Sequence, residues 1–168
     1  GFTGEEIIRE VEAMGIRSDF IKIDSGISRI NLKLKNIDGT EINGSGPEIS
    51  EEKIEELLRK LDILGEGDIL VLAGSIPASM PADMYSTIME RLQHKNVTFI
   101  VDATKDLLIN VLKYKPFLIK PNNHELGELF DVKLTTREEV IPYGKKLQKQ
   151  GARNVLISMA GEGAVLVA

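Results

Sequence analysis

The chain has no cysteine, no tryptophan and only two histidines, and aromatic residues make up 5% of its 168 positions. The lack of cysteine excludes disulfides, thiolate zinc sites, iron–sulfur clusters and cysteine nucleophiles, and it is compatible with a reducing cytosol. Because His94 and His124 stand apart and have no cysteine to join them, we expect no transition-metal site. Both histidines are expected at the surface or at helix caps, and no Ser/His/Asp triad pattern is visible.

Positive charge and long apolar runs are also scarce. Lys and Arg together number 21 against 26 for Asp and Glu, giving a net charge of −5, which argues against a nucleic-acid partner. The longest apolar stretches, such as 69–73, are a third of a membrane span or less, which argues against a membrane partner. Apolar residues at 42% and charged residues at 28% are typical of a globular domain.

The first 45 residues predict a helix followed by a small β unit. Apolar residues recur at helical spacing over 3–15, which predicts one buried face, and Thr3 with Glu6 forms a capping-box pair. Residues 20–45 instead alternate polar and apolar side chains and contain the turn signal Asp38-Gly39. This pattern predicts a small antiparallel sheet with one wet face.

From residue 50 onward the predicted helices and strands alternate, which is typical of an α/β domain with a mostly parallel sheet. The apolar run 68–73 is expected to form a buried strand, and Pro142 is expected to kink or break the helix that begins at Thr136. Ligands of such sheets bind past the carboxyl ends of the strands. Those ends are polar or glycine-rich here: Gly74-Ser75, Asp102, 120–122 and 158–161.

Residues 120–125, Lys-Pro-Asn-Asn-His-Glu, form the most informative of these ends. Asn122 or Asn123 can cap the following helix, and Glu125 falls in its first turn, where a carboxylate complements the helix dipole. An Asn and a Glu at this spacing can equally hold the water shell of Mg²⁺, while Lys120 can face a phosphate. The pattern leaves the structural and the functional interpretation open.

Three further features have both a structural and a functional interpretation. Gly74-Ser75 is either a plain turn or a backbone approach to a ligand with a hydroxyl beside it. The small residues of 158–164 either make a tight connection between strands or admit a nucleotide, although they match neither a Walker loop nor Gly-x-Gly-x-x-Gly. Arg29 is either a surface charge or a bidentate phosphate ligand.

Six segments, taken in order along the chain, resemble the ribokinase-like sugar kinases of the phosphofructokinase B type. Within that family the 1-phosphofructokinase branch is the most similar and the tagatose-6-phosphate kinase branch comes next. The segments are 1–4 (Gly-Phe-Thr-Gly), 28–31 (Ser-Arg-Ile-Asn), 40–47 with its two glycines and proline, 72–77 (Leu-Ala-Gly-Ser-Ile-Pro), 119–126 and 157–164.

The resemblance implies a sheet with helices on both faces, formed by 1–19 and 46–168, and a β lid at 20–45 that makes a homodimer contact. It also implies a cytoplasmic, Mg²⁺-dependent enzyme that transfers the ATP γ-phosphoryl group to a sugar phosphate, converting fructose 1-phosphate to fructose 1,6-bisphosphate. A tagatose-6-phosphate kinase is the alternative within the family. A non-catalytic module that binds a nucleotide or dimerises through the lid is the alternative of another class.

The resemblance also assigns roles to individual residues by matching position. Arg29, Gly74 and Ser75 contact the substrate. Lys120, Asn122, Ser158, Ala160, Gly161 and Gly163 bind ATP, while Glu125, through water, and Asn122 serve the metal. Ala160 stands where many relatives carry glycine.

The resemblance further implies that catalytic parts of the family lie outside this sequence. A substrate-binding Asp and a Gly-Gly-Lys-Gly segment are expected upstream of Gly1. A Gly-Ala-Gly-Asp motif, with the anion hole and the general base, is expected downstream of Ala168. The chain is therefore expected to be an internal fragment that contains no catalytic residue.

Overall fold

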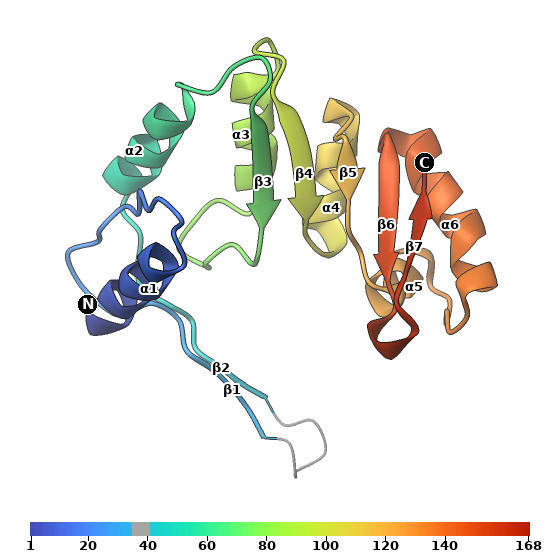
Figure 1. Ribbon diagram of the computed structural model, residues 1–168, viewed down its shortest axis with the longest axis horizontal. Helices are drawn as coiled ribbons and strands as arrows, with labels where there is room; N and C mark the ends of the chain where they lie inside the picture. The colour runs from blue at the N-terminus through green and yellow to red at the C-terminus, as the bar shows by residue number, and fades with distance from the viewer. Residues whose placement is uncertain (35–40) are drawn as a thin grey trace. The chain divides into compact units, whose positions relative to one another are not determined.

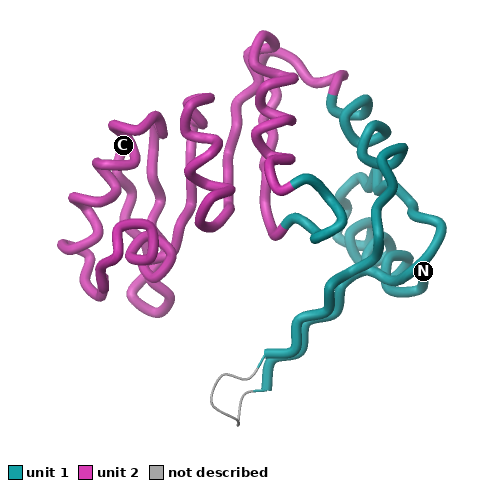
Figure 2. The backbone as a smooth tube through the Cα atoms, turned by 180° about the vertical axis from the view of Figure 1, so that it is seen from behind, with its two compact units in different colours: residues 1–61, 76–81 teal, residues 62–75, 82–168 magenta. Residues whose placement is uncertain are grey.

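The computed structural model describes residues 1–34 and 41–168. The predicted turn at Asp38-Gly39 lies outside the described residues. The chain forms two compact units, unit 1 from residues 1–61 and 76–81, and unit 2 from residues 62–75 and 82–168 (Figure 2). The lid predicted at 20–45, as a separate domain, stays a prediction.

In its described residues, 1–34, 41–61 and 76–81, unit 1 contains two helices and a two-stranded sheet. The strands are antiparallel and place Leu32 opposite Ile42 and Lys33 opposite Glu41, as the alternating pattern predicts. Lys33 Nζ lies 2.8 Å from Glu41 Oε1 on the polar face of this pair. The elements are α1 (Phe2–Ala13), β1 (Asn31–Lys33), β2 (Glu41–Asn43) and α2 (Glu51–Leu61) (Figure 1).

The predicted capping box of α1 is wrong. The helix begins at Phe2 with Gly1 as its N-cap and has no side-chain cap. The Thr3 hydroxyl instead accepts a hydrogen bond of 2.8 Å from the backbone N–H of Ser28, and Glu6 pairs with Arg9. The predicted buried face of α1 is only partly covered: none of the helix residues is fully buried, and Ile8 and Val11 are half-buried.

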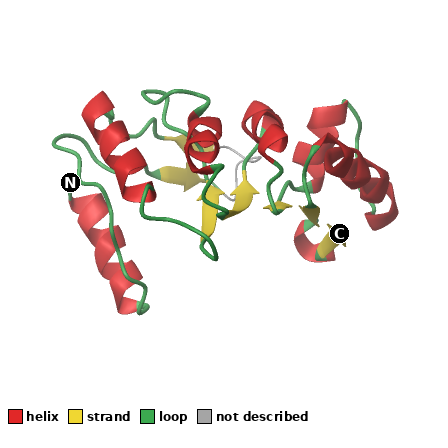
Figure 3. Cartoon of the chain, turned by 90° about the horizontal axis from the view of Figure 1, so that it is seen from above, coloured by secondary structure: helices red, strands yellow, loops and turns green. Residues whose placement is uncertain are grey.

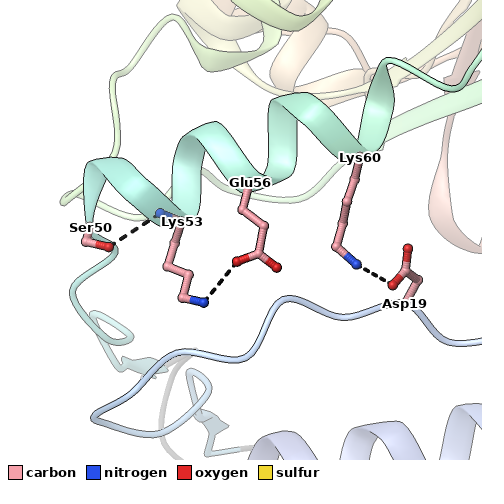
Figure 4. Close-up of polar contacts among 5 residues, drawn as sticks. All are labelled: Asp19, Ser50, Lys53, Glu56 and Lys60. Carbon is pink, nitrogen blue, oxygen red and sulfur yellow. Dashed lines mark hydrogen bonds and ion pairs between the residues drawn. The ribbon is translucent and has the colours of Figure 1, made fainter.

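Helix α2 begins directly after Ser50, where the predicted alternation of helices and strands starts. Ser50 Oγ accepts a hydrogen bond of 3.4 Å from the Lys53 backbone N–H, and Lys53 Nζ lies 2.9 Å from Glu56 Oε2. An ion pair between Lys60 and Asp19 ties the helix to the segment before β1 (Figure 4). The first two contacts stabilise α2 internally, and of the three contacts the ion pair with Asp19 is the one that joins it to another segment.

Unit 2 carries a five-stranded sheet in the order β3-β4-β5-β6-β7. Strands β3 to β6 run parallel, and β7 pairs antiparallel with β6. The predicted fold class, a mostly parallel α/β sheet with a small antiparallel sheet, is confirmed. The elements are β3 (Ile69–Ala73), α3 (Met84–Leu92), β4 (Thr98–Asp102), α4 (Lys105–Val111), the 3₁₀ turn η1 (Leu112–Tyr114), β5 (Leu118–Ile119), α5 (Asn123–Phe130), α6 (Arg137–Gln150), β6 (Asn154–Ser158), the 3₁₀ turn η2 (Ala160–Glu162) and β7 (Ala164–Val167).

The core of unit 2 lies between one face of this sheet and helices α3, α4 and α6, which gather on the same side of the strands in Figure 3. These three helices cover one face only, whereas the resemblance implies helices on both faces. Val101, Ile119 and Val155 occupy neighbouring register positions and are fully buried. Gly144 lets α6 approach the sheet, because a Cβ there would lie 2.9 Å from a methyl group of Val167. Among the described residues, no helix is long and apolar enough to cross a bilayer.

Two local features of unit 2 differ from expectation: the burial of β3, and the expected break of α6 at Pro142, for which a kink is the alternative. Strand β3 is an edge strand, and one of its faces is exposed, since Ile69 and Val71 are 63% and 55% exposed whereas Leu72 is buried. Pro142 does not break α6, which runs unbroken from Arg137 to Gln150. Because Pro142 lies in the second turn, its missing N–H leaves only the carbonyl of Glu138 without its helical partner, and residue 138 is exposed to water.

Candidate active site

Four predicted segments meet at the carboxyl edge of the sheet in unit 2, the end to which the arrowheads of β3 to β6 point in Figure 1. Parallel pairing places Ala73 opposite Asp102 and Val101 opposite Ile119. Gly74, Asp102, Lys120 and Ser158 therefore follow or end neighbouring strands at one edge, which is where ligands of open α/β sheets bind.

Asp102 and Lys120 form an ion pair across this edge. Lys120 Nζ lies 3.1 Å from Asp102 Oδ2, and about two fifths of each side chain is exposed. Tyr85 Oη donates a 2.9 Å hydrogen bond to the carbonyl of Gly74. Burial, and then the negative charge of Asp102, raises the pKa of Tyr85, so the phenol stays protonated and able to donate.

Gly74 itself has φ +90°, a backbone conformation that side chains with a Cβ rarely adopt. The turn after β3 therefore requires glycine for its conformation, and the tyrosine bond fixes its carbonyl. The next residue, Ser75, is exposed.

The segment after β5 is held by a capping box. Asn122 Oδ1 accepts a 2.8 Å hydrogen bond from the Glu125 backbone N–H, and Glu125 Oε2 accepts one of 2.8 Å from the Asn122 backbone N–H. Asn122 is thus the cap of α5. The two bonds satisfy two backbone donors of the first turn and fix both side chains at the sheet edge.

The loop between β6 and β7 lies against this capping box. The Ser158 backbone N–H donates a 3.0 Å hydrogen bond to the carbonyl of Pro121, and Asn122 and Ser158 form an isolated parallel bridge. The loop closes through a 2.8 Å hydrogen bond from the Met159 N–H to the Gly163 carbonyl. The segments 120–125 and 158–163 are far apart in the sequence and are neighbours in the fold.

The backbone of this loop favours glycine at two positions and leaves space at a third. Ala160 has φ +49° and Gly163 has φ +83°, both in the left-handed region that favours glycine. A Cβ at Gly161 would meet no atom within 4 Å. Arg137, the first residue of α6, donates a 3.1 Å hydrogen bond from Nε to the Glu162 carbonyl and fixes the tip of the loop.

The donor set at this edge fits a magnesium ion held mainly through water. Among the described residues, no three His, Asp or Glu side chains gather into a metal cage. Mg²⁺ does not require one, because it keeps several waters and takes one or two carboxylates together with substrate phosphates. Each oxygen of the Asn122–Glu125 box still has acceptor capacity beyond its one capping bond.

Arg29 lies in unit 1, whereas these residues belong to unit 2. It is exposed and stands two residues before β1, and the Gly44 N–H donates a 3.1 Å hydrogen bond to the carbonyl of the next residue, Ile30. Gly44 has to be small here, since a Cβ would lie 2.9 Å from that carbonyl oxygen. The backbone that presents Arg29 is thus fixed by the β1–β2 pairing.

Two residues at the sheet edge are not among the predicted site residues. Asp102 pairs with Lys120, and Tyr85 holds Gly74. The position of Asp102 directly at a strand end is a signal that could have found it. Tyr85 gives no such signal, because its helical spacing predicts only a core position.

The chain is similar to a known family of proteins. The model of the pfkB family of carbohydrate kinases matches residues 1–168. The chain is 48% identical over 166 residues to a 1-phosphofructokinase of Bacillus subtilis, covering 99% of this chain and 54% of the relative. It is 38% identical to a D-tagatose-1-phosphate kinase of Bacillus licheniformis, covering 98% and 54%.

Solved structures of phosphofructokinases also superpose on this chain. A Staphylococcus aureus protein assigned as a phosphofructokinase superposes with a TM-score of 0.80 at 39% identity, covering 99% of this chain and 54% of that one. Phosphofructokinase-2 of Escherichia coli in complex with substrates and products shares the fold, with a TM-score of 0.85 at 24% identity, covering 99% and 56%. The chain spans about half the length of the relatives it matches, and it belongs to the pfkB family of carbohydrate kinases.

Proposed function

We propose that the intact protein is an ATP-dependent kinase that phosphorylates fructose 1-phosphate to fructose 1,6-bisphosphate. The observation that carries this proposal is the meeting of the 120–125 and 158–163 loops at the carboxyl edge of the sheet. The 48% identity with a 1-phosphofructokinase supports the choice of substrate.

In this proposal the ATP phosphates bind between the two loops. The Lys120 ammonium neutralises phosphate charge, and the open backbone of Gly161 and Gly163 lets the nucleotide approach Ser158 and Ala160 closely. Asn122 and Glu125 orient water around a magnesium ion, which when bound neutralises the charge on the phosphates. The capping box keeps these two side chains in one conformation before ATP arrives.

The sugar phosphate is assigned to Gly74, Ser75 and Arg29. The Ser75 hydroxyl can donate to or accept from a sugar hydroxyl, and the Gly74 backbone lets the sugar approach the strand end. The Arg29 guanidinium holds the phosphate already on the sugar through two parallel hydrogen bonds.

Transfer breaks the bond between the β–γ bridging oxygen and the γ-phosphorus of ATP, and forms a new bond from the sugar hydroxyl oxygen to that phosphorus. The hydroxyl proton must pass to a base. The Gly-Ala-Gly-Asp sequence that supplies this base in the family does not occur between Gly1 and Ala168. We therefore expect the 168-residue chain alone to show no phosphoryl transfer, and a turnover near or above about 1 s⁻¹, as in ordinary kinases, would contradict this.

The test of substrate is a coupled ADP-release assay on the intact protein with fructose 1-phosphate, fructose 6-phosphate, tagatose 1-phosphate and tagatose 6-phosphate. We expect the highest kcat/KM with fructose 1-phosphate. The D-tagatose-1-phosphate kinase relative favours a tagatose phosphate as the second candidate, with the 1-phosphate ahead of the 6-phosphate. If none of the four sugars is phosphorylated, the remaining proposal is a non-catalytic nucleotide-binding or dimerising module.

We also propose that β1 and β2 contact a second copy of the chain. Leu32 and Ile42 lie opposite one another on the apolar face of this pair and are 50% and 57% exposed. An apolar face of this kind gains free energy when it is covered. Sedimentation analysis of the intact protein tests for a homodimer.

A further inference from the structure

The opposite edge of the unit 2 sheet, at the amino ends of its strands, carries a separate cavity. Its volume is about 420 Å³, and it lies beside the end of α3, the turn η1 and the starts of β4 and β5. The lining side chains that matter here are Gln93, Asn96, Lys113, Lys115, Phe117 and Arg153.

The lining is cationic in a protein that is acidic overall. Three of its side chains carry positive charge, and among the described residues the lining includes no Asp or Glu, whereas the whole chain carries −5. Within the described part of the chain, neither Lys115 nor Arg153 forms an ion pair. The cavity therefore concentrates positive charge that the surrounding fold does not neutralise.

Lys113 is the partial exception. Its ammonium lies 4.8 Å from the centre of the Tyr114 ring, and Tyr114 Oη lies 3.3 Å from Glu90 Oε2 in a hydrogen bond. Glu90 thus offsets part of the charge at one end of the cavity and leaves the end formed by Lys115 and Arg153 cationic.

The backbone brings these residues together from distant parts of the sequence. The Arg153 N–H donates a 3.0 Å hydrogen bond to the carbonyl of Pro116, and the Phe117 N–H donates one of 2.9 Å to the carbonyl of Phe99. Arg153, Phe117 and Thr98 each stand at or just before the start of a parallel strand, so they meet at one edge. The arrangement is fixed by the sheet rather than by a mobile loop.

Lys115 adds a second observation. It has φ +54° and ends η1 in the left-handed conformation, a position where glycine is the common residue. Asn96, across the lining, also has φ +54°, but asparagine tolerates this conformation. A lysine in this conformation costs backbone free energy that glycine would not. A need for positive charge in the cavity would explain why lysine stands there.

We propose that this cavity binds a small organic phosphate. The guanidinium fork of Arg153 and the ammonium of Lys115 bind the phosphate oxygens, the amides of Gln93 and Asn96 bind hydroxyl or carbonyl groups, and Phe117, which is 45% exposed, covers the apolar part. A strand of five residues spans about 15 Å, so this site does not overlap the candidate active site, and both can be occupied together.

The test is a titration of the ¹⁵N-labelled intact protein with inorganic pyrophosphate at constant ionic strength, followed by amide chemical shifts. Amides of Asn96 and Lys115 report the cavity, whereas amides of Ser158 and Gly163 report the candidate active site. We expect a saturable shift at the cavity amides with its own dissociation constant.

Charge-removing variants locate that binding. Arg153→Gln should raise the dissociation constant measured at the cavity amides at least about tenfold, since a charged bidentate contact is lost. Lys115→Asn should also raise this dissociation constant, while asparagine tolerates the left-handed backbone at this position. Lys145→Gln, an exposed position on α6 outside the cavity lining, is the matched control and should change nothing. Absence of saturable shifts at Asn96 and Lys115, or equal dissociation constants in Arg153→Gln and Lys145→Gln, overturns the proposal.

Discussion

Replacing Glu125 by glutamine separates the two roles that its position allows. In the structure Glu125 Oε2 accepts a 2.8 Å hydrogen bond from the Asn122 N–H. Glutamine has a side-chain oxygen at the same place and is a regular third residue of a capping box. Glu125→Gln therefore keeps the geometry of the cap and removes the negative charge.

The structural cost of this change is modest. Exchanging a charged acceptor for a neutral one in a hydrogen bond costs about 1 kcal/mol, and losing a carboxylate beside a helix N-terminus costs about 0.3–1 kcal/mol. The free energy of unfolding should therefore fall by about 1–2 kcal/mol, which denaturant titration of the intact protein measures.

The functional cost should be larger if Glu125 orders water around magnesium. Replacing a residue that contacts a metal only through the metal's bound groups typically lowers metal affinity or activity by about 10–100-fold. We expect kcat in the coupled assay to fall within that range and its dependence on Mg²⁺ concentration to shift to higher concentration.

Glu139 provides a matched control within the same chain. It occupies the same capping-box position at the start of α6, where Oε2 accepts a 3.0 Å hydrogen bond from the Thr136 N–H. Glu139→Gln should destabilise the protein in the same sense and leave kcat and the Mg²⁺ dependence unchanged. If Glu125→Gln behaves kinetically like Glu139→Gln, Glu125 is only a helix cap and the magnesium assignment fails.

Three further outcomes are expected. Arg29→Ala should raise the KM for the sugar phosphate roughly tenfold to a hundredfold and spare ATP, with only partial rescue by Arg29→Lys; an unchanged KM makes Arg29 a surface charge. Ala160→Gly should raise the free energy of unfolding by about 0.5–1 kcal/mol, because glycine relieves the left-handed backbone; a loss of stability on denaturant titration speaks against that strain. The backbone hydrogen bonds from Thr135 and Thr136 lower the pKa of Glu139, so its stabilising contribution is present above the ordinary Glu pKa and is lost as the pH falls through the lowered value. Glu139→Gln should therefore flatten the acid limb of stability against pH, and an acid limb as steep as in the wild type contradicts this.

Local signals in the sequence predicted most of unit 2. Met84, Ile88 and Leu92 recur at helical spacing in α3 and are buried. Asn122, one of the two expected caps, caps α5, and the helix expected from Thr136 has Thr136 as its N-cap. These features depend on spacing within one element or on bonds across three residues. Because these interactions join residues that are close in the sequence, a local sequence pattern is sufficient to predict them.

The failures have a different physical origin. The Thr3–Glu6 box satisfies every local rule, yet Thr3 is engaged by Ser28, 25 residues away. Likewise the apolar run of β3 predicts burial, although burial depends on what covers an edge strand. The ion pair between Asp102 and Lys120 and the contact between the 120–125 and 158–163 loops also required the sheet order, which no local pattern contains.

The Asp102–Lys120 pair lies at the edge of the sheet where we propose that the ATP phosphates bind. With about two fifths of each side chain exposed, such a pair contributes only about 0–1 kcal/mol. In the proposed ATP site, Lys120 can therefore leave the carboxylate of Asp102 for a phosphate at little cost, because little free energy holds the pair together. The parts around it are held by backbone bonds: the cap of α5, the Ser158–Pro121 contact and the Met159–Gly163 closure. A fixed backbone with a readily exchanged cation is the arrangement that phosphate binding by positioning and electrostatics requires.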